Sequence, residues 1–299
     1  MGFLWVPFVI AAALAQTARN ATQSHLTKLI GTAGATQVRF LYGLPFAFLF
    51  LAVVLVATGE AMPAMNARAF GFTLAGAVAQ ILATALMLVA MKDNRFAITT
   101  ALIKTEPVVV ALLAFVILGD ALTPLKLVAI VIATAGVIVL TTRRGWASGG
   151  NLGPRVVGMA VAAGLGFGLA AIGFRGGVTS LATGSFVMRA TTLLVWSLGL
   201  QTAILGLYLV AFDRRALLDS LGHWRASLAS GFLGAFASQF WFLGFALTTA
   251  ANVRTLALVE VLMAQALSRK LFAERLTPRQ STGIALIVAG VGLLLWAAG

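Results

Sequence analysis

Apolar stretches long enough to cross a membrane recur along the whole chain and constrain its fold more than any other feature. A spanning helix needs about 20 mostly apolar residues. Hydrophobic residues make up 61% of the 299 positions and charged residues 10%, which is too little charge to cover a soluble domain of this length. The sequence therefore predicts an all-α, multi-pass membrane protein. Charges, prolines and glycines delimit ten transmembrane helices, expected near residues 4–26, 35–57, 69–91, 95–118, 124–142, 155–174, 184–211, 225–247, 250–272 and 279–298.

The rarer residue types argue against enzymes, metal proteins and nucleic-acid-binding proteins. The chain has no cysteine, two histidines and eight acidic residues, and the acids are dispersed one by one, which disfavours metal chemistry or hydrolysis. The net charge of +13 comes from cations scattered between apolar runs, without the basic stripe of a nucleic-acid-binding surface. No phosphate-binding loop for ATP occurs. We expect no catalytic residue, metal or cofactor, and we expect a gradient to supply the energy for any transport.

The two halves of the chain are related by an internal duplication. A shift of 154 positions superposes Glu106 on Glu260, and it also superposes residues 122–124 on 276–278, both of which read Leu-Thr-Pro. Threonine is a common helix N-cap and proline is well tolerated at the first helical position. Each Thr-Pro therefore predicts the start of a helix.

A polar, glycine-rich stretch at residues 143–154 separates a first repeat, residues 1–142, from a second repeat, residues 155–299. Five predicted helices fall in each repeat. Because five is odd, the second repeat must enter the membrane in the opposite orientation to the first. Inverted repeats are typical of secondary transporters, whose substrate site lies near the membrane midplane between the repeats.

Four polar residues interrupt the first predicted helix. Their spacing, i, i+3, i+4 and i+7, places them on one helical face, and they are Gln16, Arg19, Asn20 and Gln23. Unpaired polar groups in hydrocarbon cost several kcal/mol each, so this face must turn away from lipid. It lines either a central cavity or a buried polar seam between helices, and the spacing alone does not separate the two.

Polar side chains in other predicted helices extend this candidate site. Ionisable residues within membrane spans mark substrate or ion pathways by default. The aromatic ring among them is suited to an apolar or aromatic part of a ligand, or to ordinary packing. We predict substrate-binding roles, beside the four residues above, for Gln80, Thr84, Lys104, Ser238, Gln239, Trp241 and Arg254.

Cations outnumber acids within or near the predicted helices. The six cations are Arg19, Arg39, Lys104, Arg175, Arg189 and Arg254, and only Glu106 and Glu260 oppose them. This excess suits a ligand with a carboxylate, which arginine can hold through two parallel hydrogen bonds. The alternative for each cation is a structural ion pair. The two glutamates are predicted to be structural struts or proton-coupling groups.

Orientation follows from the uneven distribution of cations between the two membrane faces. Cytoplasmic loops of membrane proteins carry an excess of Lys and Arg. The face from which the N-terminus emerges carries four cations, Arg68, Lys126, Arg175 and Arg254. The opposite face carries thirteen, Lys28, Lys92, Arg95, Arg143, Arg144, Arg155, Arg214, Arg215, Arg225, Arg269, Lys270, Arg275 and Arg279. We therefore expect both termini on the periplasmic side.

Residues 105–124, "TEPVVVALLAFVILGDALTP", and residues 258–278, "LVEVLMAQALSRKLFAERLTP", carry a family resemblance. Ten helices in two repeats, each with a glutamate in its fourth helix and Leu-Thr-Pro before its fifth, resemble the EamA-type branch of the drug/metabolite transporter superfamily. Within that branch the chain resembles the YddG-type exporters of aromatic and other amino acids. The resemblance implies alternating access around a central cavity built mainly from the first, third and fourth helices and their counterparts. Val261 stands where the first repeat has Pro107, so the local kinks are expected to differ.

We therefore predict a secondary transporter of the bacterial inner membrane that exports small organic metabolites, in the first place amino acids. Its expected partners are a small-molecule substrate and membrane lipid, with no nucleic acid, and the sequence leaves monomer and homodimer open. A passive channel and an uptake permease are the alternatives. A membrane enzyme is disfavoured by the dispersed acids and histidines.

Overall fold

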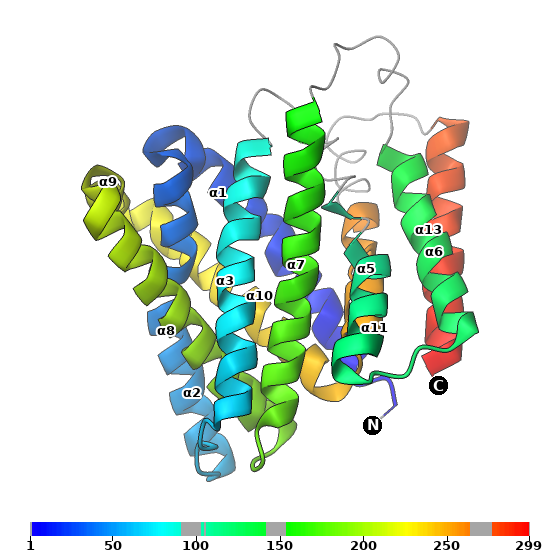
Figure 1. Cartoon of the computed structure of the whole chain (residues 1–299), viewed down its shortest axis with the longest axis horizontal. Helices are drawn as coiled ribbons and strands as arrows, with labels where there is room; N and C mark the ends of the chain where they lie inside the picture. Colours follow the sequence, from blue (N-terminus) through cyan, green and yellow to red (C-terminus); the bar gives the residue numbers. More distant parts are fainter. Residues whose placement is uncertain (1, 91–102, 105, 142–153, 264–276, 299) are drawn as a thin grey trace.

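The computed structural model describes residues 2–90, 103–104, 106–141, 154–263 and 277–298, and these form a helical bundle without a β-strand (Figure 1). In chain order the helices are α1 (Trp5–Leu41), α2 (Leu44–Thr58), α3 (Ala67–Ala90), α5 (Glu106–Leu113), the π-helix η1 (Ala114–Leu118), α6 (Pro124–Thr141), α7 (Pro154–Ser180), α8 (Phe186–Phe212), α9 (Arg214–Gly222), α10 (Trp224–Leu247), α11 (Ala250–Leu256) and α13 (Pro278–Ala298).

The predicted multi-pass, all-helical class is confirmed, whereas the number of ten spans is not. Six described segments are long and apolar enough to cross a membrane, namely Leu26–Thr58, Ala67–Ala90, Arg155–Ser180, Phe186–Phe212, Ser227–Leu247 and Pro278–Ala298. The helical segments Glu106–Leu118 and Pro124–Leu140 are apolar but shorter. Parts of the predicted fourth and ninth helices, and all but the last residue of the predicted linker, lie outside the described residues.

Both Thr-Pro sequences begin a helix, as their side chains predict. Thr123 Oγ1 accepts a hydrogen bond from the Lys126 amide at 3.3 Å before α6. Thr277 Oγ1 accepts one from the Gln280 amide at 3.3 Å before α13. Each threonine thus satisfies one of the free amides at a helix start.

The sequence predicts a loop at residues 27–34 between the first two helices, but in the structure α1 covers these residues. Within Trp5–Leu41, α1 consists of two helical segments on either side of a sharp kink at Gly31, whose φ is 72° and ψ 178°. This conformation is essentially restricted to glycine. The kink turns the chain back, so that Gln23 Nε2 donates to the Ala35 carbonyl at 3.0 Å.

Helices from the two halves pack against one another in reciprocal pairs. The most extensive contacts join α3 to α7, α6 to α13 and α1 to α10, and α2 also packs on α8. Small residues permit the close approach, as small residues do in membrane proteins. A Cβ on Gly173 would lie 2.6 Å from Gly76 Cα, and a Cβ on Gly290 would lie 2.5 Å from the Ala133 amide nitrogen. The core is therefore built between the halves rather than inside each one.

A short helix absent from the sequence prediction, α9, connects α8 to α10. Its N-cap Asp213 accepts from the Ala216 amide at 3.1 Å. Exposed Leu218 and Leu221 lie on the same helix as Arg214 and Arg215. In Figure 1, α9 lies at one end of the bundle and both chain termini lie at the other.

Candidate functional site

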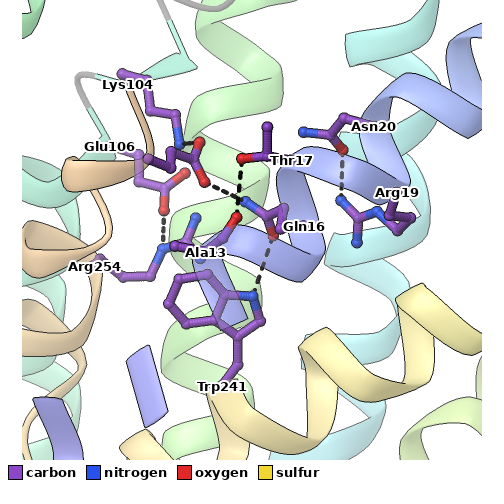
Figure 2. Close-up of polar contacts among 10 residues, drawn as sticks. Ala13, Gln16, Thr17, Arg19, Asn20, Lys104, Glu106, Trp241 and Arg254 are labelled. Atoms are coloured by element: carbon purple, nitrogen blue, oxygen red, sulfur yellow. Dashed lines mark hydrogen bonds and ion pairs between the residues drawn. The ribbon is translucent and has the colours of Figure 1, made fainter. Parts of the chain in front are cut away.

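Two buried ion pairs connect the halves of the chain where α1, α5, α10 and α11 meet (Figure 2). Lys104, which precedes α5, pairs with Glu260, which follows α11. Arg254 on α11 pairs with Glu106 at the start of α5. The side chains of all four residues are at most 12% exposed. The pairs are therefore crossed, because each glutamate is neutralised by a cation from the other half.

Gln16 on α1 links one ion pair to Trp241 on α10. Its amide nitrogen donates to Glu260 Oε2 at 3.1 Å, and its amide oxygen accepts from Trp241 Nε1 at 3.2 Å. The guanidinium of Arg254 lies 5.1 Å from the centre of the Trp241 ring, within the range of a cation–π contact. A single amide thus contacts both a charged pair and an aromatic ring.

Arg19 and Arg39 form a second polar group, and no carboxylate pairs with either among the described residues. Arg19 Nη2 donates to Asn20 Oδ1 at 2.8 Å, and Arg39 Nη1 donates to Thr84 Oγ1 at 3.2 Å. Each arginine is 3% exposed. Within the described part of the chain, Nε and Nη1 of Arg19 and Nε of Arg39 are buried without a hydrogen-bond partner.

The remaining predicted site residues separate from this centre. Gln23 contacts the backbone beyond the kink, so it stabilises the turn of α1. Gln80 on α3 accepts from Gln201 at 2.7 Å, and Gln239 on α10 donates to Thr191 at 2.8 Å. Ser238, which directly precedes Gln239 in the sequence, is also buried. The predicted polar residues thus divide between the central ion pairs, the two arginines and contacts to α8.

The structure places several polar residues near these groups that the predicted site does not include. The sequence identifies Arg39 as a cation within a span and assigns it no substrate contact. Gln201 and Thr191 lie in the seventh predicted helix, where a glutamine within an apolar span was the available signal. Their contacts depend on which helices are neighbours, which the periodicity of one helix does not show.

Carboxylates from the first half also cap helices of the second half. Glu60 Oε2 accepts from the Ser185 amide at 2.8 Å, at the start of α8. Asp120 Oδ2 accepts from the Ala250 amide at 3.4 Å, at the start of α11. The second oxygen of Asp120 pairs with Arg175 Nη2 at 3.5 Å. Negative charge at a helix N-terminus is stabilising, so these acids are structural. Among the described residues no three acids or histidines group as metal ligands.

Comparisons with known proteins agree with this arrangement. The EamA-like transporter family matches residues 3–142 and 155–296, which is one match in each half. A solved structure titled "Crystal structure of protein" is similar over 99% of this chain and 95% of that chain, with a TM-score of 0.69 and 16% sequence identity. At that identity the likeness concerns the fold alone. No curated protein matches the sequence.

The two family matches confirm the resemblance to the EamA-type branch that residues 105–124 and 258–278 carry. They also agree with the expectation that the chain is a transporter rather than an enzyme. The chain therefore belongs to the EamA-like transporter family, whose members carry small solutes across membranes.

Proposed function

We propose that this protein is a secondary transporter of the bacterial inner membrane that exports small organic metabolites, in the first place amino acids, including aromatic ones, by alternating access. The observation that carries the proposal is the buried network of crossed ion pairs around Gln16 and Trp241. It lies where elements of both halves meet, and the midplane between repeats is where secondary transporters bind their substrates.

The balance of charge supports a substrate with a carboxylate. Two buried carboxylates, Glu106 and Glu260, oppose four cations: the buried Arg19, Arg39 and Lys104, and Arg254, whose side chain is 12% exposed. Unpaired charge in a low-dielectric interior is costly, and a substrate carboxylate would offset part of it. The Trp241 ring next to Arg254 offers an apolar surface for a substrate side chain.

The crossed ion pairs also support the proposed mechanism. Alternating access in inverted-repeat transporters is largely a rocking of one repeat against the other. Since each pair connects the halves, such a motion has to break or exchange both pairs. Lys104 and Arg254 would then release their glutamates when substrate enters, so that substrate binding and the motion are coupled.

Counterflow in proteoliposomes tests the proposal. Purified protein is reconstituted into vesicles loaded with unlabelled amino acid, and uptake of the same labelled amino acid is followed. We expect transient, saturable accumulation with a panel that includes leucine, phenylalanine and glutamate. Linear, non-saturable flux would identify a passive channel instead. In intact cells, faster loss of preloaded amino acid from expressing cells supports export, and faster accumulation would identify an uptake permease.

A further inference from the structure

The kink of α1 brings together two arginines that are far apart along the helix. Arg19 and Arg39 are 20 positions apart, so a straight helix would separate them by about 30 Å. In the fold both lie against Gly234 of α10. A Cβ at Gly234 would be 3.3 Å from Arg39 Cγ and 3.6 Å from Arg19 Cδ. The backbone turn at Gly31 therefore brings the side-chain stems of the two arginines to the same glycine of α10.

The charges of this pair are not neutralised by the described part of the protein. Lys104 and Arg254 each have a glutamate, whereas the side-chain hydrogen bonds of Arg19 and Arg39 go to the neutral groups of Asn20 and Thr84, and Arg39 also lies over the Phe40 ring at 5.3 Å. Three guanidinium nitrogens are buried without a partner among the described residues. Buried donors and buried charges are normally satisfied. An acidic group that accepts hydrogen bonds from these nitrogens would meet both requirements.

We propose that Arg19 and Arg39 form an anion-binding subsite for an acidic group, a carboxylate or a phosphate, of the transported solute. The described centre carries four cations and two carboxylates. A neutral amino acid leaves this excess of two positive charges unchanged, an acidic amino acid offsets half of it, and a solute with two anionic groups and no ammonium offsets all of it. The inference rests on the proposed function and ranks its substrates: amino acids and related acids with a second anionic group are preferred over neutral ones, with Arg39 as a determinant of this preference.

Binding to the purified protein tests the subsite separately from transport. Apparent affinities are measured from ligand-dependent thermal stabilisation for glutamate against its near-isostere glutamine, for phosphoserine against serine, and for succinate. We expect wild type to bind the member of each pair with the second acid at least tenfold more tightly. The glutamate and phosphoserine arms distinguish a carboxylate site from a phosphate site. Equal affinity within both pairs would overturn the inference.

Substitutions of single arginines test whether the preference for a second acidic group depends on Arg19 and Arg39. Arg39→Gln and Arg19→Gln should each weaken the affinity for the acidic ligands by about ten- to a hundredfold, because a charged hydrogen bond is lost. The affinity for glutamine or serine should change less than threefold. Arg68→Gln, at the exposed start of α3, removes the same charge and should change neither the affinity for the acidic ligands nor that for the neutral ones. An equal loss for acidic and neutral ligands would show that the arginines are structural.

One variant keeps every arginine in place. Asn20 already accepts from Arg19, so Asn20→Asp should give the subsite an internal carboxylate of nearly the same shape. It should fold at least as well as wild type and lose the preference for glutamate over glutamine. An unchanged preference would count against the subsite. If wild type transports leucine without any preference for acids, this inference fails while the proposed function stands. If only succinate binds and is carried, the amino-acid proposal fails while the subsite stands.

Discussion

At the scale of single residues, the four cations of the candidate site differ in whether a carboxylate lies beside them. Lys104 and Arg254 have one, whereas Arg19 and Arg39 have none among the described residues. Removing one partner of a buried ion pair leaves the other charge unpaired and is strongly destabilising. Removing a cation that lacks a counter-charge leaves only neutral groups behind. The two kinds of cation should therefore respond to mutation differently.

This difference gives a prediction about stability. Lys104→Met should lower the free energy of unfolding by about 3–5 kcal/mol, because Glu260 keeps a buried charge. Arg39→Met keeps a similar apolar stem and should cost much less, since the side chain that loses a hydrogen bond is the neutral Thr84. Unfolding of both variants in the same detergent measures the contrast. Equal destabilisation would contradict the distinction between paired and unpaired cations.

A second prediction concerns Gln16. Replacing it by Leu removes the hydrogen bonds to Glu260 and Trp241 and leaves both groups short of a partner. We expect transport in the counterflow assay to fall by about tenfold or more, the effect of a lost buried hydrogen bond to a charged group. Leu14→Ala, on the same helix and 52% exposed, is the control and should change transport little. Similar losses at equal expression would show that the network around Gln16 serves packing alone.

At the scale of elements, the kink of α1 is the feature on which the site depends most. Gly31 has a φ of 72° and a ψ of 178°, and a Cβ there would meet no atom within 4 Å. Gly31→Ala should therefore destabilise the protein through backbone strain alone, by about 1–3 kcal/mol. It should also weaken the preference for glutamate over glutamine, because the turn places Arg39 beside Arg19.

Gly292→Ala is the matched control for this prediction. Gly292 lies in α13 with ordinary backbone angles, and a Cβ there also meets nothing within 4 Å. Alanine is favoured over glycine in a helix by up to about 1 kcal/mol, so this variant should be as stable as wild type or slightly more stable. If the two alanine variants unfold alike, the backbone conformation of Gly31 is not what holds the kink.

At the scale of the whole molecule, the fold places both termini at one end of the bundle and α9 at the other (Figure 1). The cation bias predicts that the α9 end is cytoplasmic. Because the chain has no cysteine, Met62→Cys and Leu221→Cys each introduce a single label site. Met62, which precedes α3, and Leu221 on α9 are both exposed. In intact cells an impermeant thiol reagent should label position 62 and spare position 221, and the reverse pattern would refute the proposed orientation.

The sequence by itself determined the class of protein and much of its chemistry. Membrane spans depend on local apolar content, since backbone hydrogen bonds in hydrocarbon must be satisfied within each helix. The shift of 154 positions between Glu106 and Glu260 could be read from the chain directly. The polar stripe of the first helix was predicted to turn away from lipid, and Gln16 and Arg19 are indeed held within the protein.

The tertiary structure alone decided which polar groups meet. Lys104 pairs with Glu260 and Arg254 with Glu106 because α5 and α11 are neighbours, and helix periodicity says nothing about neighbours. Gln23, predicted in the site, donates to the backbone of the turn that follows it. Arg19 and Arg39 come together only because one glycine reverses the chain, at a point that the sequence presented as an ordinary loop. Periodicity acts within one helix, whereas a binding site forms where helices converge.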